Sequence, residues 1–214
     1  MFYVEGVGVR QDSGMPAATQ TTRFDDVTLE GEGLSLRPFT DADLDAIAEA
    51  CADEETQRWL PLPRTYSRDD ARWFVQTFAV AQRDSGAGLV RAIEVDGRLA
   101  GAIDLKKTNW TARTTETGYW ASPWVRGRGV TTAAVRLLAS WALTDQGLER
   151  VELLTAMGNT GSERVADKAG FQREGIARNA GVIHAGRVDL TVWSLVPADL
   201  IPTPDEAAAE PGRR

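Results

Sequence analysis

A glycine-rich segment in the middle of the chain, Val125-Arg126-Gly127-Arg128-Gly129-Val130-Thr131, has the residue types of an anion-binding loop. It follows a strand-like run, Thr114 to Trp120, and precedes a predicted helix from about Thr131 to Asp145. Backbone N–H groups at a helix start and the positive end of the helix dipole both favour a phosphate. Glycines permit backbone angles that other residues avoid, and the two arginines add positive charge. The spacing indicates a pyrophosphate site, although a solvated glycine-rich turn would explain the same residues taken alone.

A second polar segment lies one helix and one strand further on, and it reads Asn159-Thr160-Gly161-Ser162-Glu163-Arg164-Val165-Ala166-Asp167-Lys168-Ala169-Gly170-Phe171. It resembles the Asn-x-x-Ser-x-Arg-Val-x-x-Lys-x-Gly-Phe run in the RimJ/RimL-like branch of the GNAT superfamily, whose members resemble ribosomal-protein alanine N-acetyltransferases. The loop is similar to the acyl-CoA loop of that superfamily, Gln/Arg-x-x-Gly-x-Gly/Ala. Further matches are Leu36-Arg37-Pro38, Glu116-Thr117-Gly118-Tyr119-Trp120 and Gly186-Arg187-Val188-Asp189, so the resemblance covers roughly Leu34 to Val196.

This resemblance implies a single-domain GNAT fold that uses acetyl-CoA as co-substrate and no metal. In the family, the strand ending at Trp120 and the next strand splay apart, and the pantetheine arm lies between them like an extra strand. An unpaired strand edge has the free N–H and C=O groups that this mode of binding needs. The resemblance implies that the cofactor-binding residues are Val125, Arg126, Gly127, Arg128, Gly129, Val130, Thr131, Asn159 and Ser162. Thr131 departs from the family, which usually has Gly or Ala there, and its side chain could crowd the cofactor.

Glu116 is the candidate general base. An amine must lose a proton before it attacks a thioester, because an ammonium has no lone pair. In the strand before the loop, Glu116, Gly118 and Trp120 share one face, and Gly118 leaves room beside the glutamate for a substrate or a water. The family position supports the same residue, acting directly or through water. The alternative is an ordinary ion pair between Glu116 and an arginine at a strand end.

Ser162 is the candidate proton donor to the leaving thiolate. Many GNAT enzymes use a tyrosine in the C-terminal half for this, but no tyrosine follows Tyr119 in this chain. The counterpart of Ser162 in the RimJ/RimL-like branch lies close to the CoA sulfur, and a hydroxyl can donate. The resemblance also implies a hydrogen bond from Asn159 to the pantetheine. A structural role is open too, since Thr160-x-x-Glu163 is a capping-box pattern, and we expect Thr160 to cap the short helix.

The elements that position these residues follow from hydrophobic periodicity. The predicted order is βααβββαβαββ, an α/β or α+β domain whose sheet, by the resemblance, is mixed and mostly antiparallel. Val135, Leu138 and Ala142 form one apolar stripe on the helix after the loop. The turn Asp96-Gly97 predicts a hairpin between the second and third strands. The predicted strands are Leu34–Arg37, Leu89–Val95, Leu99–Leu105, Thr114–Trp120, Arg150–Thr155, Phe171–Ala177 and Arg187–Leu195, and the predicted helices start near Thr40 and Ser67 and span Thr131–Asp145 and Gly161–Ala169.

The predicted domain organisation is an N-terminal tail over 1–33, a GNAT N-acyltransferase domain over 34–198 and a disordered C-terminal tail over 199–214. Neither end shows sustained periodicity, and the C-terminal segment is rich in Pro, Glu, Ala and Gly. Met15 is an alternative start to Met1, because the residues between them carry no pattern that the fold needs.

Composition excludes several other chemistries. Lys and Arg number 24 and Asp and Glu 31, a net charge of −7, so the surface as a whole should repel nucleic acid and anionic membranes. Cys51 is the single cysteine and His184 the single histidine, which leaves no support for a zinc site, a Cys/His dyad or a Ser/His/Asp triad. We read His184 as a solvent-exposed loop residue. No apolar run is long enough to span a bilayer, so we expect a cytoplasmic protein.

The leading functional prediction is an N-acetyltransferase that moves an acetyl group from acetyl-CoA to a primary amine. The amine belongs to a protein or peptide N-terminus, or to a small metabolite or antibiotic, and a succinyl or other acyl group is an alternative. Acidic residues and the aromatic segment Arg58 to Tyr66 suggest an acceptor site for a cation on a partly apolar body. A homodimer is one assembly that the sequence leaves open. The competing predictions are a catalytically silent acyl-CoA sensor and a nucleotide-binding protein, but no Gly-Lys-Ser/Thr ending supports the latter.

Overall fold

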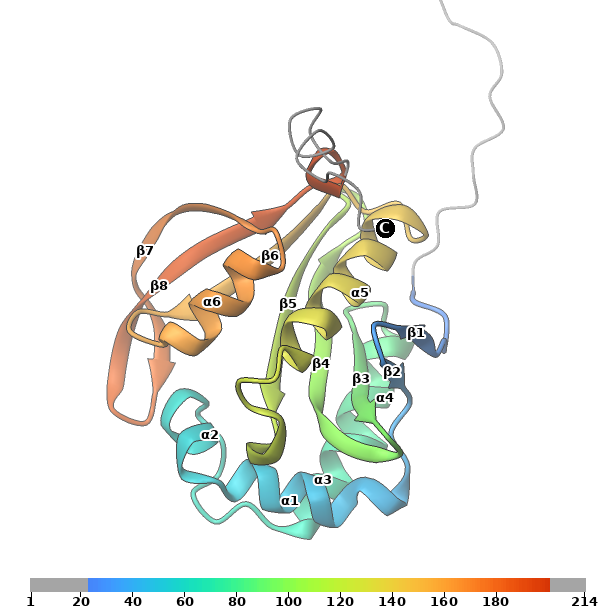
Figure 1. Ribbon diagram of the computed structural model, residues 1–214, viewed down its shortest axis with the longest axis vertical. Helices are drawn as coiled ribbons and strands as arrows, with labels where there is room; N and C mark the ends of the chain where they lie inside the picture. The colour runs from blue at the N-terminus through green and yellow to red at the C-terminus, as the bar shows by residue number, and fades with distance from the viewer. Residues whose placement is uncertain (1–22, 201–214) are drawn as a thin grey trace, which may run out of the picture.

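The computed structural model describes residues 23–200. These residues form one eight-stranded sheet with the strand order β1-β2-β3-β4-β5-β6-β8-β7 (Figure 1). The parallel neighbours are β5 and β6, and the other described pairs are antiparallel. The strands are β1 (Leu29–Gly31), β2 (Leu34–Arg37), β3 (Leu89–Val95), β4 (Arg98–Asn109), β5 (Thr114–Ala121), β6 (Arg150–Ala156), β7 (Gln172–Ile183) and β8 (Gly186–Leu195). The structure confirms the predicted mixed, mostly antiparallel sheet.

Helices cover both faces of the sheet. The helices are α1 (Leu44–Ala52), α2 (Glu54–Trp59), α3 (Arg68–Trp73), α4 (Ala79–Asp84), α5 (Val130–Thr144) and α6 (Thr160–Lys168), and α3 continues into α4 through a π-helical turn, η2 (Phe74–Phe78). Short 3₁₀ turns are η1 (Asp41–Asp43), η3 (Pro123–Val125) and η4 (Pro197–Leu200). Ile93 packs in the core that includes α5, whereas its neighbour Ala92 packs in the core of α1 and α3. Adjacent strand residues point to opposite faces, so the two helix layers lie on opposite sides of the sheet.

The order of elements agrees with the prediction, with two additions. One addition is α2, a separate helix that starts after Asp53, whose side chain accepts from the Thr56 N–H. The β3–β4 hairpin turns at Asp96 and Gly97 as predicted, with φ of 50° and 71°, the positive values that a two-residue type I′ turn requires. The predicted stripe on α5 is confirmed because Val135, Leu138 and Ala142 are fully buried. The other addition is β1, which the sequence did not indicate.

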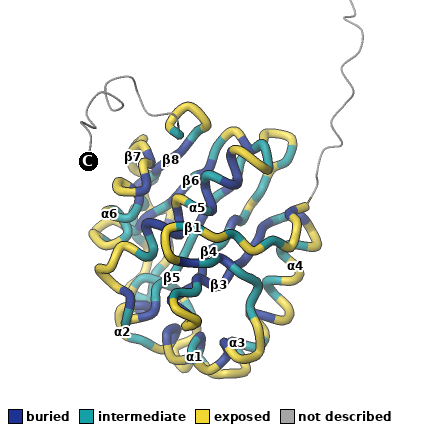
Figure 2. The backbone as a smooth tube through the Cα atoms, turned by 45° about the vertical axis from the view of Figure 1, so that its right-hand side comes forward, coloured by how far each residue is buried: buried dark blue, intermediate teal, exposed yellow. Residues whose placement is uncertain are grey.

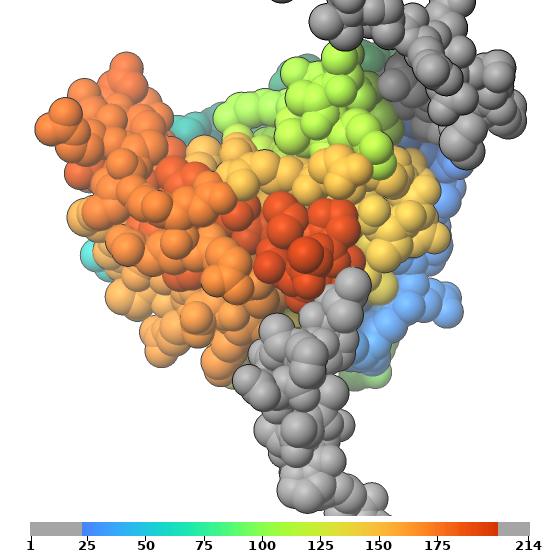
Figure 3. All heavy atoms as spheres, turned by 90° about the horizontal axis from the view of Figure 1, so that it is seen from above, coloured from blue at the N-terminus to red at the C-terminus, as the bar shows by residue number. Residues whose placement is uncertain are grey.

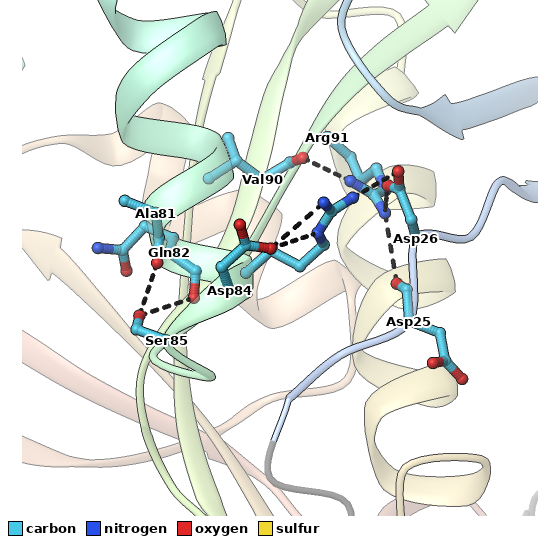
Figure 4. A network of polar contacts seen from close by, with 9 residues as sticks. Asp25, Asp26, Ala81, Gln82, Asp84, Ser85, Val90 and Arg91 are labelled. Atoms are coloured by element: carbon cyan, nitrogen blue, oxygen red, sulfur yellow. Dashed lines mark hydrogen bonds and ion pairs between the residues drawn. The ribbon is translucent and has the colours of Figure 1, made fainter.

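Part of the predicted N-terminal tail belongs to the domain. The side chain of Phe24 is 1% exposed, and its ring lies 4.8 Å from that of Trp110 and 5.9 Å from that of Trp141. Arg91, buried in β3, donates to Asp26 Oδ1 at 2.8 Å (Figure 4). It also donates to the backbone oxygen of Val27 at 2.9 Å. Residues 23–33 therefore pack on the sheet, and assigning them to a tail was wrong. Residues 1–22 lie outside the described residues.

The C-terminal end of the described chain also packs on the domain. Viewed from above, the end of β8 and η4, in red, lie between the yellow end of α5 and the orange segments that follow it (Figure 3). Leu200 packs against the main core, so the domain extends to that residue rather than ending at 198. The middle strands β3 and β4 are mostly buried, whereas β7 is exposed along most of its length (Figure 2). Among residues 23–200, no helix is long and apolar enough to cross a membrane.

Candidate active site

A cleft lies where β5 and β6 part. The two strands pair from Thr114 with Arg150 to Thr117 with Leu153 and no further, while β5 stays paired with β4 and β6 with β8 (Figure 1). The edges 118–121 and 154–156 therefore face one another with backbone groups that lack a ladder partner between β5 and β6. The cleft has a volume of about 360 Å³. Its lining includes residues from β5, β6, α2, the glycine loop and α6.

The glycine loop closes one end of this cleft. Gly127 and Gly129 have φ of 76° and 82°, and a Cβ added at either would meet no atom within 4 Å. Gly129 is the N-cap of α5 and offers no side chain to its first turn. The N–H groups of Val130 and Thr131 have no preceding turn to donate to, so they remain available to a ligand. This geometry fits a pyrophosphate, as an acyl-CoA would supply.

Arg126, predicted to bind the cofactor, is paired with two residues at the start of α2. Its guanidinium donates to Asp53 and, at 2.9 Å, to Thr56 Oγ1, which ties the loop to the start of α2. Burial of the Asp53 carboxyl raises its pKa, but hydrogen bonds from Arg126 and from the Thr56 N–H outweigh this and lower the pKa overall. Arg126 therefore positions the loop, and its charge is largely neutralised by Asp53.

The predicted cofactor residues divide into three groups. Lining the cleft are Arg126, Gly127, Thr131, Asn159 and Ser162. A neighbouring hollow of about 470 Å³ is lined by Arg128, Gly129 and Val130, together with Arg136 and Lys168. The side chain of Val125 is 2% exposed and packs in the core, so the prediction that Val125 contacts the cofactor is not supported for its side chain.

Ser162 meets a tyrosine that sequence reasoning passed over. Tyr119 and Ser162 both line the cleft, and their hydroxyl oxygens lie 2.7 Å apart. Burial raises the pKa of Tyr119 to about 12, although the hydrogen bond with Ser162 opposes part of that rise, so the phenol keeps its proton at neutral pH. The search for a tyrosine considered only the C-terminal half. Strand alternation, which sends Tyr119 to the face opposite Glu116, is the signal that could have found it.

Asn159, rather than the expected Thr160, caps α6. Its Oδ1 accepts from the N–H of Ser162 at 3.1 Å, and Thr160 is already the first helical residue. The side-chain oxygen of Asn159 is thus used by the helix. Its amide nitrogen is the part of the side chain that could donate to a ligand in the cleft.

Glu116 lies beside the cleft, and its carboxylate is held by two lysines. Its Oε2 accepts from Lys107 Nζ at 2.7 Å, and its Oε1 lies 3.5 Å from Lys106 Nζ. The arginine partner considered from sequence is therefore wrong. The room expected at Gly118 is occupied, because a Cβ there would lie 2.2 Å from Lys106 Nζ. Lys106 and Gly118 line the cleft beside this glutamate.

The cleft is also lined by α2, and the turn of the β7–β8 hairpin contacts this helix. Trp59 and Leu60 line the cleft, and their role in an acceptor site stays a prediction, whereas Tyr66 packs in the core of α1 and α3. His184, at the hairpin turn, is bonded through Nε2 to Gln57 Oε1 at 3.0 Å and is half-buried. The Gln57 amide nitrogen already donates to two backbone oxygens, so its Oε1 accepts and His184 donates. His184 therefore links hairpin and helix and is not a freely solvated loop residue.

A family model described as an acetyltransferase (GNAT) domain matches residues 34–172. The chain belongs to this family. The expected RimJ/RimL-like resemblance is confirmed, and acetyl-CoA is the co-substrate that family membership implies. Among the described residues, no cluster of three or more potential ligands is placed to hold a metal.

Among its relatives is the Bacillus subtilis protein named "Putative ribosomal N-acetyltransferase YdaF", which is 29% identical over 170 residues, or 77% of this chain and 92% of that protein. A crystal structure titled as a probable acetyltransferase is 28% identical with a TM-score of 0.72, covering 81% of this chain and 98% of the other. Mycobacterium smegmatis RimJ, solved with CoA-disulfide, has the same fold at 22% identity and a TM-score of 0.73, covering 78% and 83% of the two chains.

Proposed function

We propose that this N-acetyltransferase moves the acetyl group of acetyl-CoA to the free α-amine of a protein or peptide by direct attack on the thioester. The observation that carries the proposal is the cleft between the parted strands β5 and β6, which has an anion-binding loop at one end and a hydroxyl pair inside it. The name of the YdaF relative favours a protein N-terminus over a small metabolite. A cytoplasmic location and a homodimer stay predictions from the sequence.

The residues fit the donor as follows. The N–H groups of the loop and the first turn of α5 would hold the pyrophosphate. The free edges of β5 and β6 would hold the amides of pantetheine as an added strand does. With the pantetheine held in this way, the thioester would lie near Gly118, where the strands part, and its sulfur near Ser162.

The chemistry needs one proton acceptor and one proton donor. The amine loses a proton to a carboxylate on the acceptor side, for which Glu116 is the sequence-based candidate, acting directly or through water. Its lone pair then forms the N–C bond to the acetyl carbonyl carbon, the C–S bond breaks, and the nitrogen loses its second proton to water to give the amide. The thiolate takes a proton from Ser162, and Tyr119, 2.7 Å from Ser162 and protonated at neutral pH, replaces it. A catalytically silent sensor would have no use for this hydroxyl pair.

The test is to incubate the protein with acetyl-CoA and three acceptors while free thiol is measured. The acceptors are a peptide with a free N-terminus, the same peptide with a blocked N-terminus and one internal lysine, and a small polyamine. We expect thiol release with the free N-terminus above all. Acetyl-CoA should also raise the melting temperature, whereas ATP and NAD should have little effect, because only a ligand bound by the folded state stabilises it. A melting shift without thiol release from any amine would indicate the sensor, and succinyl-CoA in a parallel reaction tests the acyl group.

A further inference from the structure

Three charged side chains form a cluster on the face of the sheet opposite α5 and α6, at the point where β5 leaves β6. Asp104 lies across from Gly118, and Lys106 lies across from Glu116, in the register between β4 and β5. Lys106 Nζ is 3.5 Å from Asp104 Oδ1 and 3.5 Å from Glu116 Oε1. Lys106 lines the cleft, so the cluster borders the space in which acetyl transfer is proposed.

Asp104 contains a buried carboxylate oxygen without a hydrogen bond, and the Lys106 ammonium is its charged neighbour at 3.5 Å. Its Oδ1 is buried and takes part in no hydrogen bond, and it is the one such side-chain atom among residues 23–200. Buried polar atoms almost always have a partner, so an orphan of this kind calls for an explanation. Gly118, opposite Asp104, is the first residue of β5 beyond its last pair with β6. The orphan oxygen is therefore directed at the place where the strands part.

The Lys106 ammonium indicates which kind of chemical group fits beside Gly118. Its primary ammonium lies between two carboxylates, against the backbone of Gly118, where a Cβ would be 2.2 Å from Nζ and 3.2 Å from Asp104 Oδ1. A protonated α-amine is the same chemical group. The Lys106 ammonium thus occupies a position that suits an acceptor before it loses its proton.

The two carboxylates differ in what they can still accept. Glu116 receives a hydrogen bond from Lys107 at 2.7 Å in addition to its contact with Lys106. Asp104 has Lys106 nearby but no hydrogen bond to Oδ1, and its neighbour on β3 is the apolar Val90. Burial raises the pKa of the Asp104 carboxyl and outweighs the opposing effect of Lys106. A raised pKa suits a group that must take a proton near neutral pH.

We infer that Asp104 and Glu116 form the ammonium site for the acceptor, that Lys106 occupies this site when no acceptor is bound, and that Asp104 takes the proton of the amine. The inference rests on the proposed function. It gives the role of proton acceptor to Asp104 instead of Glu116, the sequence-based candidate, and leaves Glu116 to bind the ammonium. The proton passes from the amine nitrogen to Asp104 Oδ1. The freed lone pair forms the N–C bond, and the C–S electron pair stays on sulfur, which takes a proton from the Ser162–Tyr119 pair. The acylated nitrogen loses its second proton to water, and Asp104 later returns its own proton to water.

The experiment compares wild type with Asp104→Asn, Lys106→Met and the matched control Asp96→Asn in the β3–β4 turn. It measures turnover of the free-amine peptide across pH 5 to 9, about the range in which perturbed carboxylates titrate. Asp104→Asn keeps the shape of the side chain, so its acetyl-CoA melting shift should match that of wild type. Its kcat should fall roughly 100-fold, in line with the loss of a positioned general base, and the acidic limb of its pH profile should change. Asp96→Asn should behave as wild type, since Asn tolerates the positive φ of that turn.

Lys106→Met keeps the test decisive if Asp104→Asn does not fold. Removing the competing ammonium leaves Asp104 without its neighbouring cation and Glu116 with Lys107 alone, so the KM for the peptide should fall several-fold. Wild-type kcat and an unchanged pH profile in Asp104→Asn would overturn the inference and leave the proposed function standing. An unchanged or raised peptide KM in Lys106→Met would overturn the stand-in role of Lys106. No turnover by wild type with any amine would overturn the proposed function and this inference together.

Discussion

Replacing Gly129 by valine should separate the backbone strain of the loop from its role in ligand binding. Gly129 has φ of 82°, and an added Cβ would meet no atom within 4 Å, so a side chain there is opposed by the backbone conformation and not by a clash. An L-residue in the left-handed region costs about 1–2 kcal/mol, and a β-branched one lies at the upper end. For a domain of this size, 1 kcal/mol corresponds to roughly 2–4 °C in melting temperature. We therefore expect the melting temperature of Gly129→Val without ligand to fall by roughly 2–8 °C.

The same substitution should weaken acetyl-CoA binding by a further mechanism. Gly129 directly precedes α5, so any relaxation of its φ rotates the first N–H groups of the helix. Loss of one hydrogen bond to a charged phosphate costs about 1.5–3 kcal/mol. Since about 1.4 kcal/mol is a factor of ten in affinity, the KM for acetyl-CoA should rise roughly 10- to 100-fold.

Gly97→Val is the matched control. Gly97 has φ of 71°, also has open space around an added Cβ, and lines neither the cleft nor the hollow beside the loop. It should lose a similar amount of stability while its KM for acetyl-CoA stays at the wild-type value. The assays are thermal melting with and without acetyl-CoA and initial rates of thiol release. If Gly129→Val and Gly97→Val have the same KM, the loop does not bind the pyrophosphate and the reasoning is refuted.

Two further predictions follow from contacts between distant segments. Deleting residues 1–28 should lower the melting temperature, because it removes Phe24, and the loss of a buried Phe side chain alone costs about 3–5 kcal/mol. Phe24→Ala in the full chain should reproduce most of this decrease. Unchanged melting temperatures of both variants would show that the segment around Phe24 does not contribute to stability. Ser162→Ala should lower kcat with little change in melting temperature, because Ser162 contributes the hydroxyl beside Tyr119 and Asn159 caps the helix. Asn159→Ala, by contrast, should cost about 1 kcal/mol of stability. Both are read by melting and turnover on the same sample, and wild-type kcat in Ser162→Ala would exclude its hydroxyl as the proton donor.

Local signals determined most of the fold. The β3–β4 turn needs only Asp96 and Gly97 between two apolar runs, and the stripe on α5 needs only its own periodicity. The glycine loop is likewise local, because Gly127 and Gly129 take their positive φ within a few residues of the strand and helix that they join. Such features depend on residues close in the chain, which is why the sequence alone predicted them.

Tertiary structure alone decided how the site is assembled. Tyr119 and Ser162, whose hydroxyls are in contact, are 43 positions apart in the sequence. Arg126 and its partner Asp53 are 73 positions apart. The orphan oxygen of Asp104 depends on the register between β4 and β5 and on the point at which β5 leaves β6. Phe24 is buried only because aromatic rings from two distant elements surround it. Burial and pairing of this kind are properties of the packed chain, and no local pattern in the sequence encodes which polar atom is left without a partner.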